Sequence, residues 1–342
     1  MANSQPSPLN RAEKRSFSLA IGVDVGATKI ASALVDGDGH LLAQRQEPTA
    51  AQNGTAAVLD RIAAQIETLV AAASSRQDQS PHAAGLLGIG IGTPGQVNPK
   101  SGVVRNAVNL GWEEVHLVAE IQRRIGSNLP VWIQKDANAS ALGEYYFGAA
   151  RNCDDFVYLG IGSGLGAGVL SGGRLVTGSN WNAAELGHLS LDPEGLPCNC
   201  GLRGCAETVV SGPGLVSVVR RRMQQNDLQT ELTPDNVSPQ QILAAAQVAD
   251  ELALAALTEV GGYLGSVMAA CTALLNPALF VLGGGLGLAA YDWLVPPAME
   301  ELQRRVLESS YQSVRVSPSS LKSSAVGAAG LVWYYKLREG SL

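Results

Sequence analysis

The sequence predicts an α/β protein of two similar halves, each a mixed sheet with helices on its faces, that face each other across a cleft. A βββαβα order of strand and helix patterns occurs twice along the 342 residues. In each half a strand, a turn bearing Asp or Ser among glycines, and a returning strand recur, at Asp24 and at Ser163. Elements in this order form sheets covered by helices.

Length and composition fit this class. The 342 residues, 46% of them hydrophobic, suffice for about two domains. The net charge of −6 argues against a general nucleic-acid binder, which usually carries a basic patch. Residues 1–17 have no apolar h-region, so we expect a flexible tail rather than a signal peptide. No stretch reaches the roughly 20 uninterrupted apolar residues of a membrane span, so no membrane partner is expected.

The first half opens with three strand patterns and a hairpin signal, Asp-Gly-Asp-Gly, at 36–39. Apolar residues at helical spacing follow. The predicted elements are strands at 17–25, 30–34 and 41–46, a helix at 55–73, a strand at 86–91, a hairpin, a helix at 115–125, a strand at 131–133 and a helix at 139–147.

The second half repeats the opening strands and then becomes mostly helical. The predicted elements are strands at 156–161, up to 170 and at 174–176, a helix from 211, a polar surface insertion at 224–238, helix over most of 239–275, a strand at 279–282, a helix at 298–307, a strand at 314–316 and a last helix at 325–337.

A cluster of metal-binding residue types lies in the middle of the second half. Three of the five cysteines, Cys198, Cys200 and Cys205, fall within eight residues, and His188 stands ten positions before the first. One imidazole and three thiolates form the donor set of a closed, tetrahedral structural zinc site. The alternative, three ordinary buried cysteines and a core histidine, explains the clustering less well. Metal ligation rather than disulfides indicates a reducing compartment, so we expect a cytoplasmic protein.

The predicted zinc loop carries further chemistry. Gly201 and Gly204 allow the positive φ that a tight knuckle needs. Glu185 and Glu207 bracket the cluster, so a metal that fixes the loop also fixes both carboxylates. These carboxylates, together with His188, could bond several hydroxyls of one polyol; the alternative is that they are surface glutamates.

Three glycine-rich turns could hold a nucleotide. In Asp24-Val-Gly-Ala-Thr-Lys29, Gly26 lets backbone amides approach a phosphate, Thr28 can hydrogen-bond it, and the lysine adds positive charge. Asp24 suits Mg²⁺, although such a turn can equally be a plain hairpin. The run 160–168 is a second anion cradle, and because a strand follows it, a dinucleotide fold is disfavoured. The run 283–285 can admit a flat ring against bare backbone.

Asp136 follows a strand in a polar loop, where a carboxylate can act as general base on a substrate hydroxyl or as an N-cap of the next helix. Asn109 and Trp112 lie in an Asn-rich loop, which offers a polar contact and a ring platform of the kind that sugars favour. The alternative for Trp112 is a core position.

Taken together, Glu185-Leu-Gly-His188 and Cys198-Asn-Cys-Gly-Leu-Arg-Gly-Cys205-Ala-Glu207 resemble the signature of the ROK family of sugar kinases and repressors. The resemblance runs from about Ile21 to Leu337. It implies the two-lobed, actin-like (ribonuclease H-like) ATPase fold. It places an N-terminal lobe at 18–135 plus 322–342, after the tail 1–17, and a C-terminal lobe with the zinc loop at 136–321.

The resemblance also implies an activity: an ATP- and Mg²⁺-dependent hexose kinase, most nearly a glucokinase, with Asp136 as the base toward the 6-hydroxyl. It implies that one ring nitrogen of His188 serves the metal and the other the sugar. The implied zinc ligands are His188, Cys198, Cys200 and Cys205. The implied hexose ligands are Gly95, Asn109, Asp136, Glu185, His188 and Glu207. The implied nucleotide-binding residues are Asp24, Gly26, Ala27, Thr28, Lys29, Gly162, Ser163, Gly164, Gly166, Gly284 and Gly285.

Two positions depart from the family pattern. Lys135 stands where the kinases commonly carry Asn, and Ser163 stands where they commonly carry Thr. We expect Lys135 to point away from the sugar and to carry its ammonium to solvent. About seventeen residues before the first strand are too few for the repressors' helix-turn-helix domain, so DNA binding is not expected.

Alternative readings remain within and outside kinase chemistry. The substrate could be N-acetylmannosamine, N-acetylglucosamine or fructose, or the chain could be a non-catalytic sugar sensor that binds a partner protein. The family further implies a homo-oligomer, a dimer or a tetramer.

Overall fold

The computed structural model describes residues 18–77, 85–225 and 228–339, so the predicted tail at 1–17 lies outside the described part. The chain divides into two compact units. The first unit comprises 1–151, 177–182 and 320–342, and the second comprises 152–176 and 183–319. Residues 136–151 thus fall in the first unit, whereas the predicted lobe boundary lay after residue 135. The reason is that the helix at 136–147 packs on the last helix of the chain.

The first unit is built on a five-stranded mixed sheet in the order β3-β2-β1-β4-β8. β1, β2 and β3 are antiparallel neighbours, and β1, β4 and β8 run parallel. A second sheet, β5-β6-β7, follows β4 in the chain. The strands are β1 Leu19–Val25, β2 Lys29–Asp36, β3 Leu41–Pro48, β4 Leu86–Thr93, β5 Gln96–Asn98, β6 Val103–Ala107, β7 Trp112–Val115 and β8 Val131–Lys135.

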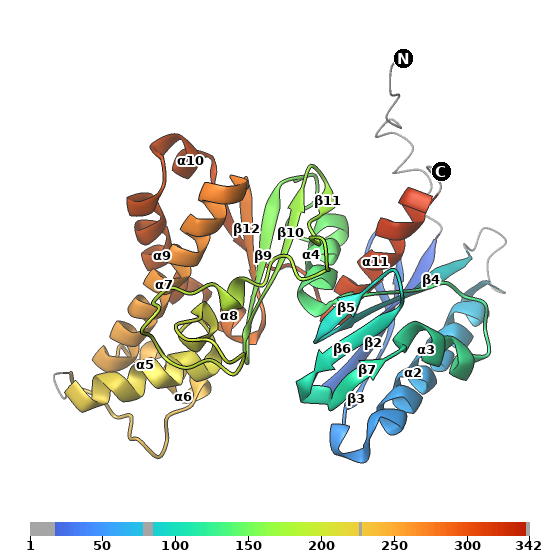
Figure 1. The fold of residues 1–342 in the computed structure, drawn as a ribbon, viewed down its shortest axis with the longest axis horizontal. Helices are drawn as coiled ribbons and strands as arrows, with labels where there is room; N and C mark the ends of the chain where they lie inside the picture. The colour runs from blue at the N-terminus through green and yellow to red at the C-terminus, as the bar shows by residue number, and fades with distance from the viewer. Residues whose placement is uncertain (1–17, 78–84, 226–227, 340–342) are drawn as a thin grey trace. The chain divides into compact units, whose positions relative to one another are not determined.

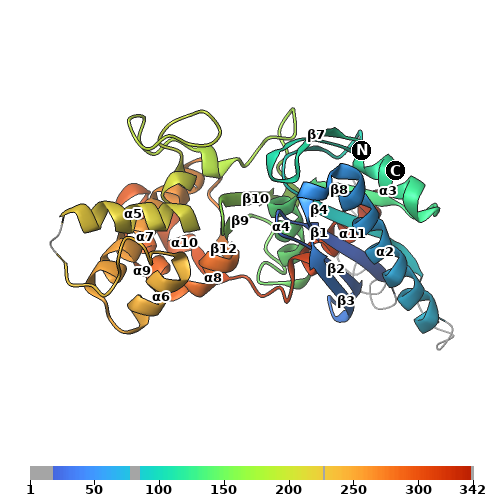
Figure 2. The same cartoon turned by 90° about the horizontal axis from the view of Figure 1, so that it is seen from below.

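Helices cover both faces of the first sheet (Figures 1 and 2). Alternate apolar residues of β1, such as Ile21 and Val23, enter a core with α2 and α3. On the opposite face a Cβ built on Gly22 would lie 1.9 Å from the Ala325 carbonyl oxygen, so α11 contacts the bare backbone of β1. The helices of this unit are α2 Thr55–Gln77, α3 Leu117–Ile125, α4 Asp136–Phe147 and α11 Ser324–Glu339, with short 3₁₀ turns η1 Ala51–Asn53 and η2 Val108–Leu110.

The second unit repeats the topology of the first. Its sheet has the order β11-β10-β9-β12-β13. β9, β10 and β11 are antiparallel neighbours, and β9, β12 and β13 run parallel. The strands are β9 Phe156–Ile161, β10 Leu165–Ser171, β11 Arg174–Leu175, β12 Leu279–Gly283 and β13 Arg315–Pro318. The twofold occurrence of this mixed sheet confirms the predicted α/β class and its internal repeat.

The helices of the second unit lie between β11 and β13 along the chain, some before β12 and some after it. They are α5 Gly212–Gln225, α6 Pro239–Gln247, α7 Glu251–Leu275, α8 Gly285–Ala289, α9 Tyr291–Arg305 and α10 Glu308–Ser313, with 3₁₀ turns η3 Leu186–His188 and η4 Ala206–Thr208. α7 and α9 lie side by side (Figure 1), and a Cβ built on Gly261 of α7 would lie 2.4 Å from Pro297 of α9. Among the described residues, α7 has the length and composition to cross a membrane, but 61% of its most apolar window is buried inside the unit.

Several predicted helices differ from the structure. The helix predicted at 298–307 is α9, Tyr291–Arg305, and the helix predicted at 139–147 begins at Asp136. The helix predicted at 115–125 begins at Leu117, because Trp112–Val115 is a strand. The helix predicted over most of 239–275 is interrupted at 248–250. There Ala249 has a φ of 61° and the Asp250 side chain caps α7 by accepting a hydrogen bond from Ala253 N at 2.9 Å. An N-cap side chain satisfies backbone donors that have no partner inside a helix.

Candidate active site and metal-binding loop

The four predicted zinc ligands converge. One ligand atom from each of His188, Cys198, Cys200 and Cys205 lies within 4.8 Å of the others. His188 Nδ1 is 3.8 Å from Cys198 Sγ, and Cys200 Sγ is 3.7 Å from Cys205 Sγ. A tetrahedral zinc with Zn–S bonds of about 2.3 Å separates two sulfur ligands by about 3.8 Å. The donor set and its spacing therefore fit a structural zinc ion.

Backbone hydrogen bonds hold the loop that carries these thiols. Cys198 N donates to Leu202 O, and Gly204 N donates to Leu196 O, each at 2.8 Å. Gly201 has a φ of 90° and Gly204 a φ of 66°. The prediction that both glycines adopt positive φ is confirmed, and the turn they make brings Cys205 back to Cys198 and Cys200.

The thiols sit in contrasting surroundings. Cys205 is buried, and burial, reinforced by the neighbouring thiols of Cys200 and Cys198, raises its pKa to about 12. Cys200 is exposed, and a hydrogen bond with the Leu202 backbone lowers its pKa. A buried thiol among other thiols is poorly placed to ionise alone, and a cation bound among them would stabilise the thiolates. Among the described residues there is no disulfide; all five cysteines are free.

The second glycine-rich turn joins β9 to β10. Gly162 N donates to Gly164 O at 2.9 Å, and Gly212 N at the start of α5 donates to Gly162 O at 2.8 Å. A Cβ built on Gly284 would lie 2.3 Å from Ile161 O, so the third glycine run packs directly beside this turn. A strand follows the turn, as expected. The structure therefore brings two of the three predicted nucleotide-binding segments together.

The segments that carry the predicted hexose ligands of the second unit touch the same turn. Leu165 N donates to Glu207 Oε2 at 3.0 Å. A Cβ built on Gly187 of η3 would lie 2.3 Å from Leu165 O. Glu185, two residues before Gly187, is exposed. Glu207 is thus not a free surface glutamate: its carboxylate is bonded to the first residue of β10, directly after the β9–β10 turn.

The first glycine-rich turn joins β1 to β2. Gly26 N donates to Lys29 O at 2.9 Å, and Thr49 Oγ1 donates to Gly26 O at 2.6 Å. Ala27, Thr28 and Lys29 are exposed at its tip, where their polar groups can meet a phosphate.

Asp24 is the residue before the last of β1 and is partly buried. Burial raises the pKa of its carboxyl, while a hydrogen bond from the Ser324 side chain and the charge of Lys29 lower it. Ser324, the first residue of α11, was missed by sequence analysis because it lies 300 residues away and carries no local signal. A carboxylate that is desolvated without a full counter-charge suits a cation such as Mg²⁺.

Asp136 is the first residue of α4 and is exposed. The N-cap position belongs to Lys135, so the N-cap interpretation of Asp136 is wrong. Asp136 Oδ1 accepts from Ala137 N at 2.7 Å, which fixes the carboxylate at the end of β8. A Cβ built on Gly92 would lie 3.5 Å from Asp136 Cα and 3.8 Å from Asp24 Oδ1. Asp24 and Asp136 therefore flank Gly92 at one end of the first sheet.

The remaining predicted ligands of the first unit lie by β6 and η2. A Cβ built on Gly95 would lie 2.7 Å from Arg105 O, so Gly95 packs against β6. Asn109 is exposed on η2. Trp112 is only 2% exposed and belongs to the core, so the ring-platform interpretation is wrong.

Lys135 also differs from expectation. It is 7% exposed, so the interpretation that its stem carries the ammonium to solvent is wrong. As the last residue of β8, it alternates with the buried Gln134, whose Nε2 donates to Tyr335 OH at 3.0 Å. Neighbouring residues of a strand face opposite sides of the sheet. Lys135 is therefore on the face opposite Tyr335.

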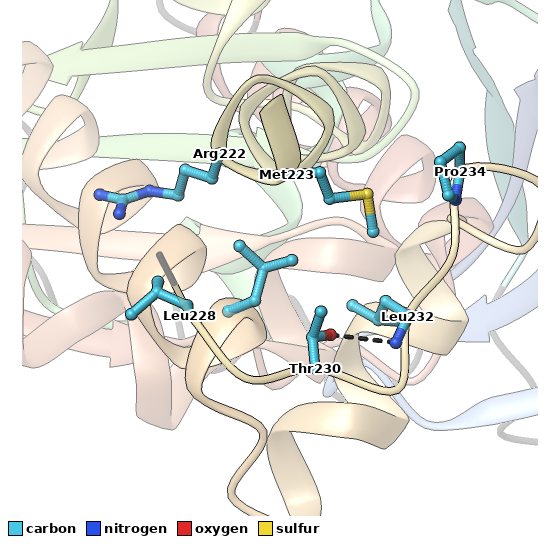
Figure 3. Close-up of a pocket in the computed structure, with 7 residues that line it drawn as sticks. Arg222, Met223, Leu228, Thr230, Leu232 and Pro234 are labelled. Carbon is cyan, nitrogen blue, oxygen red and sulfur yellow. Dashed lines mark hydrogen bonds between the residues drawn. The ribbon is translucent and has the colours of Figure 1, made fainter. Parts of the chain in front are cut away.

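A cavity of about 280 Å³ lies in the second unit, and none of the predicted site residues lines it (Figure 3). Thr230 Oγ1 accepts from Leu232 N at 3.0 Å in its wall. It is lined by Arg222, Met223, Leu228, Thr230, Leu232, Pro234 and Leu252. Its lining offers one cation and no carboxylate, and we assign it no role.

The predicted site residues thus form local groups within each unit. The first unit holds Asp24, the Gly26–Lys29 turn, Gly95, Asn109 and Asp136; the second holds the Gly162–Gly166 turn, Gly284, Gly285, Glu185, Glu207 and the four metal-binding residues.

Known proteins match this chain over most of its length. The model of the ROK family matches residues 20–334. A glucokinase of Halalkalibacterium halodurans is 31% identical over 327 residues, which cover 94% of this chain and 96% of the glucokinase. The crystal structure of a ROK family glucokinase from Streptomyces griseus, in complex with glucose and AMPPNP, matches with a TM-score of 0.74 at 30% identity, covering 92% of this chain and 98% of that one. A ROK family transcriptional regulator, a homologue of the E. coli MLC protein, matches with a TM-score of 0.80 at 28% identity, covering 93% of this chain and 78% of the regulator.

Proposed function

Because the chain belongs to the ROK family, we propose that it is an ATP-dependent hexose kinase that phosphorylates the 6-hydroxyl, with glucose as its substrate. The similarity to glucokinases spans nearly the whole length of both chains, which supports this activity. The observation that carries the proposal is the pair of carboxylates, Asp24 and Asp136, on either side of Gly92.

In this proposal the two carboxylates have separate roles. Asp136, exposed and held by the Ala137 N–H, takes the proton from the hexose 6-hydroxyl as that oxygen attacks the γ-phosphorus. Asp24, whose pKa burial raises, is the residue that would hold Mg²⁺, which neutralises phosphate charge when bound. The bond between the γ-phosphorus and the oxygen that links it to the β-phosphate breaks, and ADP leaves.

The glycine-rich turns position the nucleotide. Phosphoryl transfer depends mainly on positioning and charge stabilisation, which backbone N–H groups and a lysine can supply. We assign the phosphates to Gly26, Ala27, Thr28 and Lys29 and to Gly162, Ser163, Gly164 and Gly166, and the adenosine to Gly284 and Gly285. Gly285 supports this assignment, because a Cβ built there meets nothing within 4 Å, which leaves its backbone open.

We assign the hexose to Gly95, Asn109, Asp136, Glu185, His188 and Glu207. His188 presents Nδ1 to Cys198 Sγ, which leaves Nε2 for a hydroxyl. A zinc ion on His188, Cys198, Cys200 and Cys205 would be structural, because four protein ligands close its tetrahedron. Elemental analysis of the purified protein should find one zinc per chain, and its absence would refute this assignment.

A coupled assay of ADP release with a panel of hexoses tests the activity. We expect turnover with glucose that requires both ATP and Mg²⁺. Faster turnover with N-acetylmannosamine, N-acetylglucosamine or fructose would change the substrate but keep the class of enzyme. A protein that binds hexose without releasing ADP would instead be a sugar sensor, the alternative favoured by the similarity to the transcriptional regulator.

We further propose a cytoplasmic homo-oligomer. Five free cysteines, three of them in the metal-binding loop, support a reducing compartment. The oligomeric state can be measured by light scattering on the zinc-loaded protein.

A further inference from the structure

Glu207 joins the metal-binding loop to the phosphate-binding turn. It lies in η4, two residues after the metal-binding Cys205. Its Oε2 accepts a hydrogen bond from Leu165 N at 3.0 Å, and Leu165 is the first residue of β10, directly after Gly164. One side chain therefore spans two segments that are more than 40 residues apart in the chain.

The turn is shaped to receive this carboxylate. A Cβ built on Gly164 would lie 2.2 Å from Glu207 Oε2, so the carboxylate occupies the space that any other residue at 164 would fill. The backbone of the same segment is also anchored: Ser211 Oγ donates to Glu207 O at 2.7 Å, and Gly212 N donates to Gly162 O at 2.8 Å. Both ends of the turn are thus held by the segment 207–212.

The other hexose-binding segment reaches the same residue of the turn. Gly187 of η3 lies between Glu185 and His188, and a Cβ built on it would lie 2.3 Å from Leu165 O. Leu165 therefore meets both segments that carry the hexose ligands assigned to the second unit.

We propose that Glu207 is a positioning residue that couples hexose binding to nucleotide binding through its hydrogen bond to Leu165 N, so that each substrate increases the affinity for the other. This inference rests on the proposed function, because it takes the hexose and phosphate sites from it. A carboxylate has two acceptor oxygens; Leu165 N engages one, and a hexose hydroxyl can engage the other. A hexose that fixes the carboxylate also orders the turn. The nucleotide then binds with a smaller loss of conformational entropy, because the turn is already ordered.

The coupling factor is the ratio of nucleotide dissociation constants without and with saturating hexose. Calorimetry with AMPPNP, which avoids turnover, measures it for the full-length, zinc-loaded protein with the hexose that the panel selects. We expect a factor of about 5 or more in the unmutated protein, the lower end of typical coupling between sites. By linkage, the nucleotide must increase hexose affinity by the same factor. A factor of one would overturn the inference.

Two glycine substitutions separate the coupling from general damage to the turn. Gly164→Ala places a methyl group on Glu207 Oε2 and should reduce the factor toward one, with zinc content unchanged. Gly162→Ala adds the same methyl group two residues away, where nothing lies within 4 Å. A change in nucleotide affinity itself enters both dissociation constants, so the ratio should stay unchanged. An undiminished factor in Gly164→Ala would overturn the inference.

A second pair of variants tests the side chain directly and does not depend on how Gly164→Ala folds. Glu207→Gln keeps an oxygen that can accept from Leu165 N, whereas Glu207→Ala has none. Both variants should weaken hexose binding, but the coupling factor is measured with saturating hexose, so this loss does not enter it. Only Glu207→Ala should therefore abolish the coupling. Equal factors in the two variants would contradict the role. Absence of any hexose binding in the unmutated protein would refute the proposed function itself, whereas hexose binding with unaltered coupling in the variants refutes this inference alone.

Discussion

Gly204 is the position at which the metal-binding loop should tolerate a side chain least, and Gly201 offers a matched control. Both have positive φ, 66° and 90° respectively. A Cβ built on Gly204 would lie 1.5 Å from the Asp192 carbonyl oxygen, whereas a Cβ on Gly201 meets nothing within 4 Å. Gly204→Ala and Gly201→Ala therefore share backbone strain and differ in the clash.

The expected difference follows from the contacts of each position. A left-handed conformation costs a residue other than glycine about 1–2 kcal/mol, which applies to both variants. In Gly204→Ala the backbone must also move to relieve the clash with Asp192 O. This movement breaks two hydrogen bonds, from Gly204 N to Leu196 O and from Leu191 N to Gly204 O. Each contributes about 0.5–1.5 kcal/mol net. We expect zinc affinity to fall about 5- to 30-fold in Gly201→Ala and about 30- to 4,000-fold in Gly204→Ala.

Competition for zinc with a chromophoric chelator measures both affinities at neutral pH. The comparison is meaningful because Cys205, the buried ligand, directly follows Gly204 and moves with it. Equal zinc affinities in the two variants would refute the reasoning, since the Asp192 contact would then have no influence on the ligand geometry.

Three further changes give distinct outcomes. Asp136→Asn should lower kcat by about 10²- to 10⁴-fold, the usual effect of losing a general base, with an unchanged melting temperature; near-normal turnover would exclude Asp136 as the base. For Asp24, burial raises the folded-state pKa above 3.8, so the native state binds its proton more tightly than the unfolded chain, and the free energy of unfolding should fall as pH rises from about 3.8 through the raised pKa. Urea unfolding of nucleotide-free protein should show that Asp24→Asn flattens this fall; an unaltered pH profile would contradict it. Trp112→Ala should destabilise the fold by about 3–5 kcal/mol, because it truncates a core side chain. Trp112→Phe should keep hexose affinity, and a clear loss of affinity in this variant would indicate that the Trp112 ring contacts the sugar.

The sequence by itself determined the order of elements and the chemistry of the clustered motifs. Alternating apolar residues and hairpin signals are local properties, so the β1–β2–β3 meander and the β9–β10 turn could be read from the chain. The candidate metal-binding cluster could be predicted for a related reason. His188 and the three cysteines lie within a short stretch of sequence, so their clustering is visible in the chain, and in the structure their ligand atoms converge.

Tertiary structure decided the surroundings of single residues. The sequence predicts that Lys135 reaches solvent and leaves Trp112 open between a ring platform and a core position. Both residues are buried, because burial depends on which segments far away in the chain pack over a position. A helix expected to run through 248–250 is broken there, because the Asp250 cap stabilises a new start.

The contacts that give the candidate sites their properties are also long-range. The hydrogen bond between Ser324 and Asp24 joins the last helix to the first strand, and that between Leu165 and Glu207 joins the β9–β10 turn to the loop of the candidate metal site. Neither has a local signal in the sequence, since each partner alone is an ordinary polar or backbone group. Residue types predicted the kinds of ligand that the candidate sites suit, and packing between distant segments decided which carboxylate is desolvated and which is fixed to a turn.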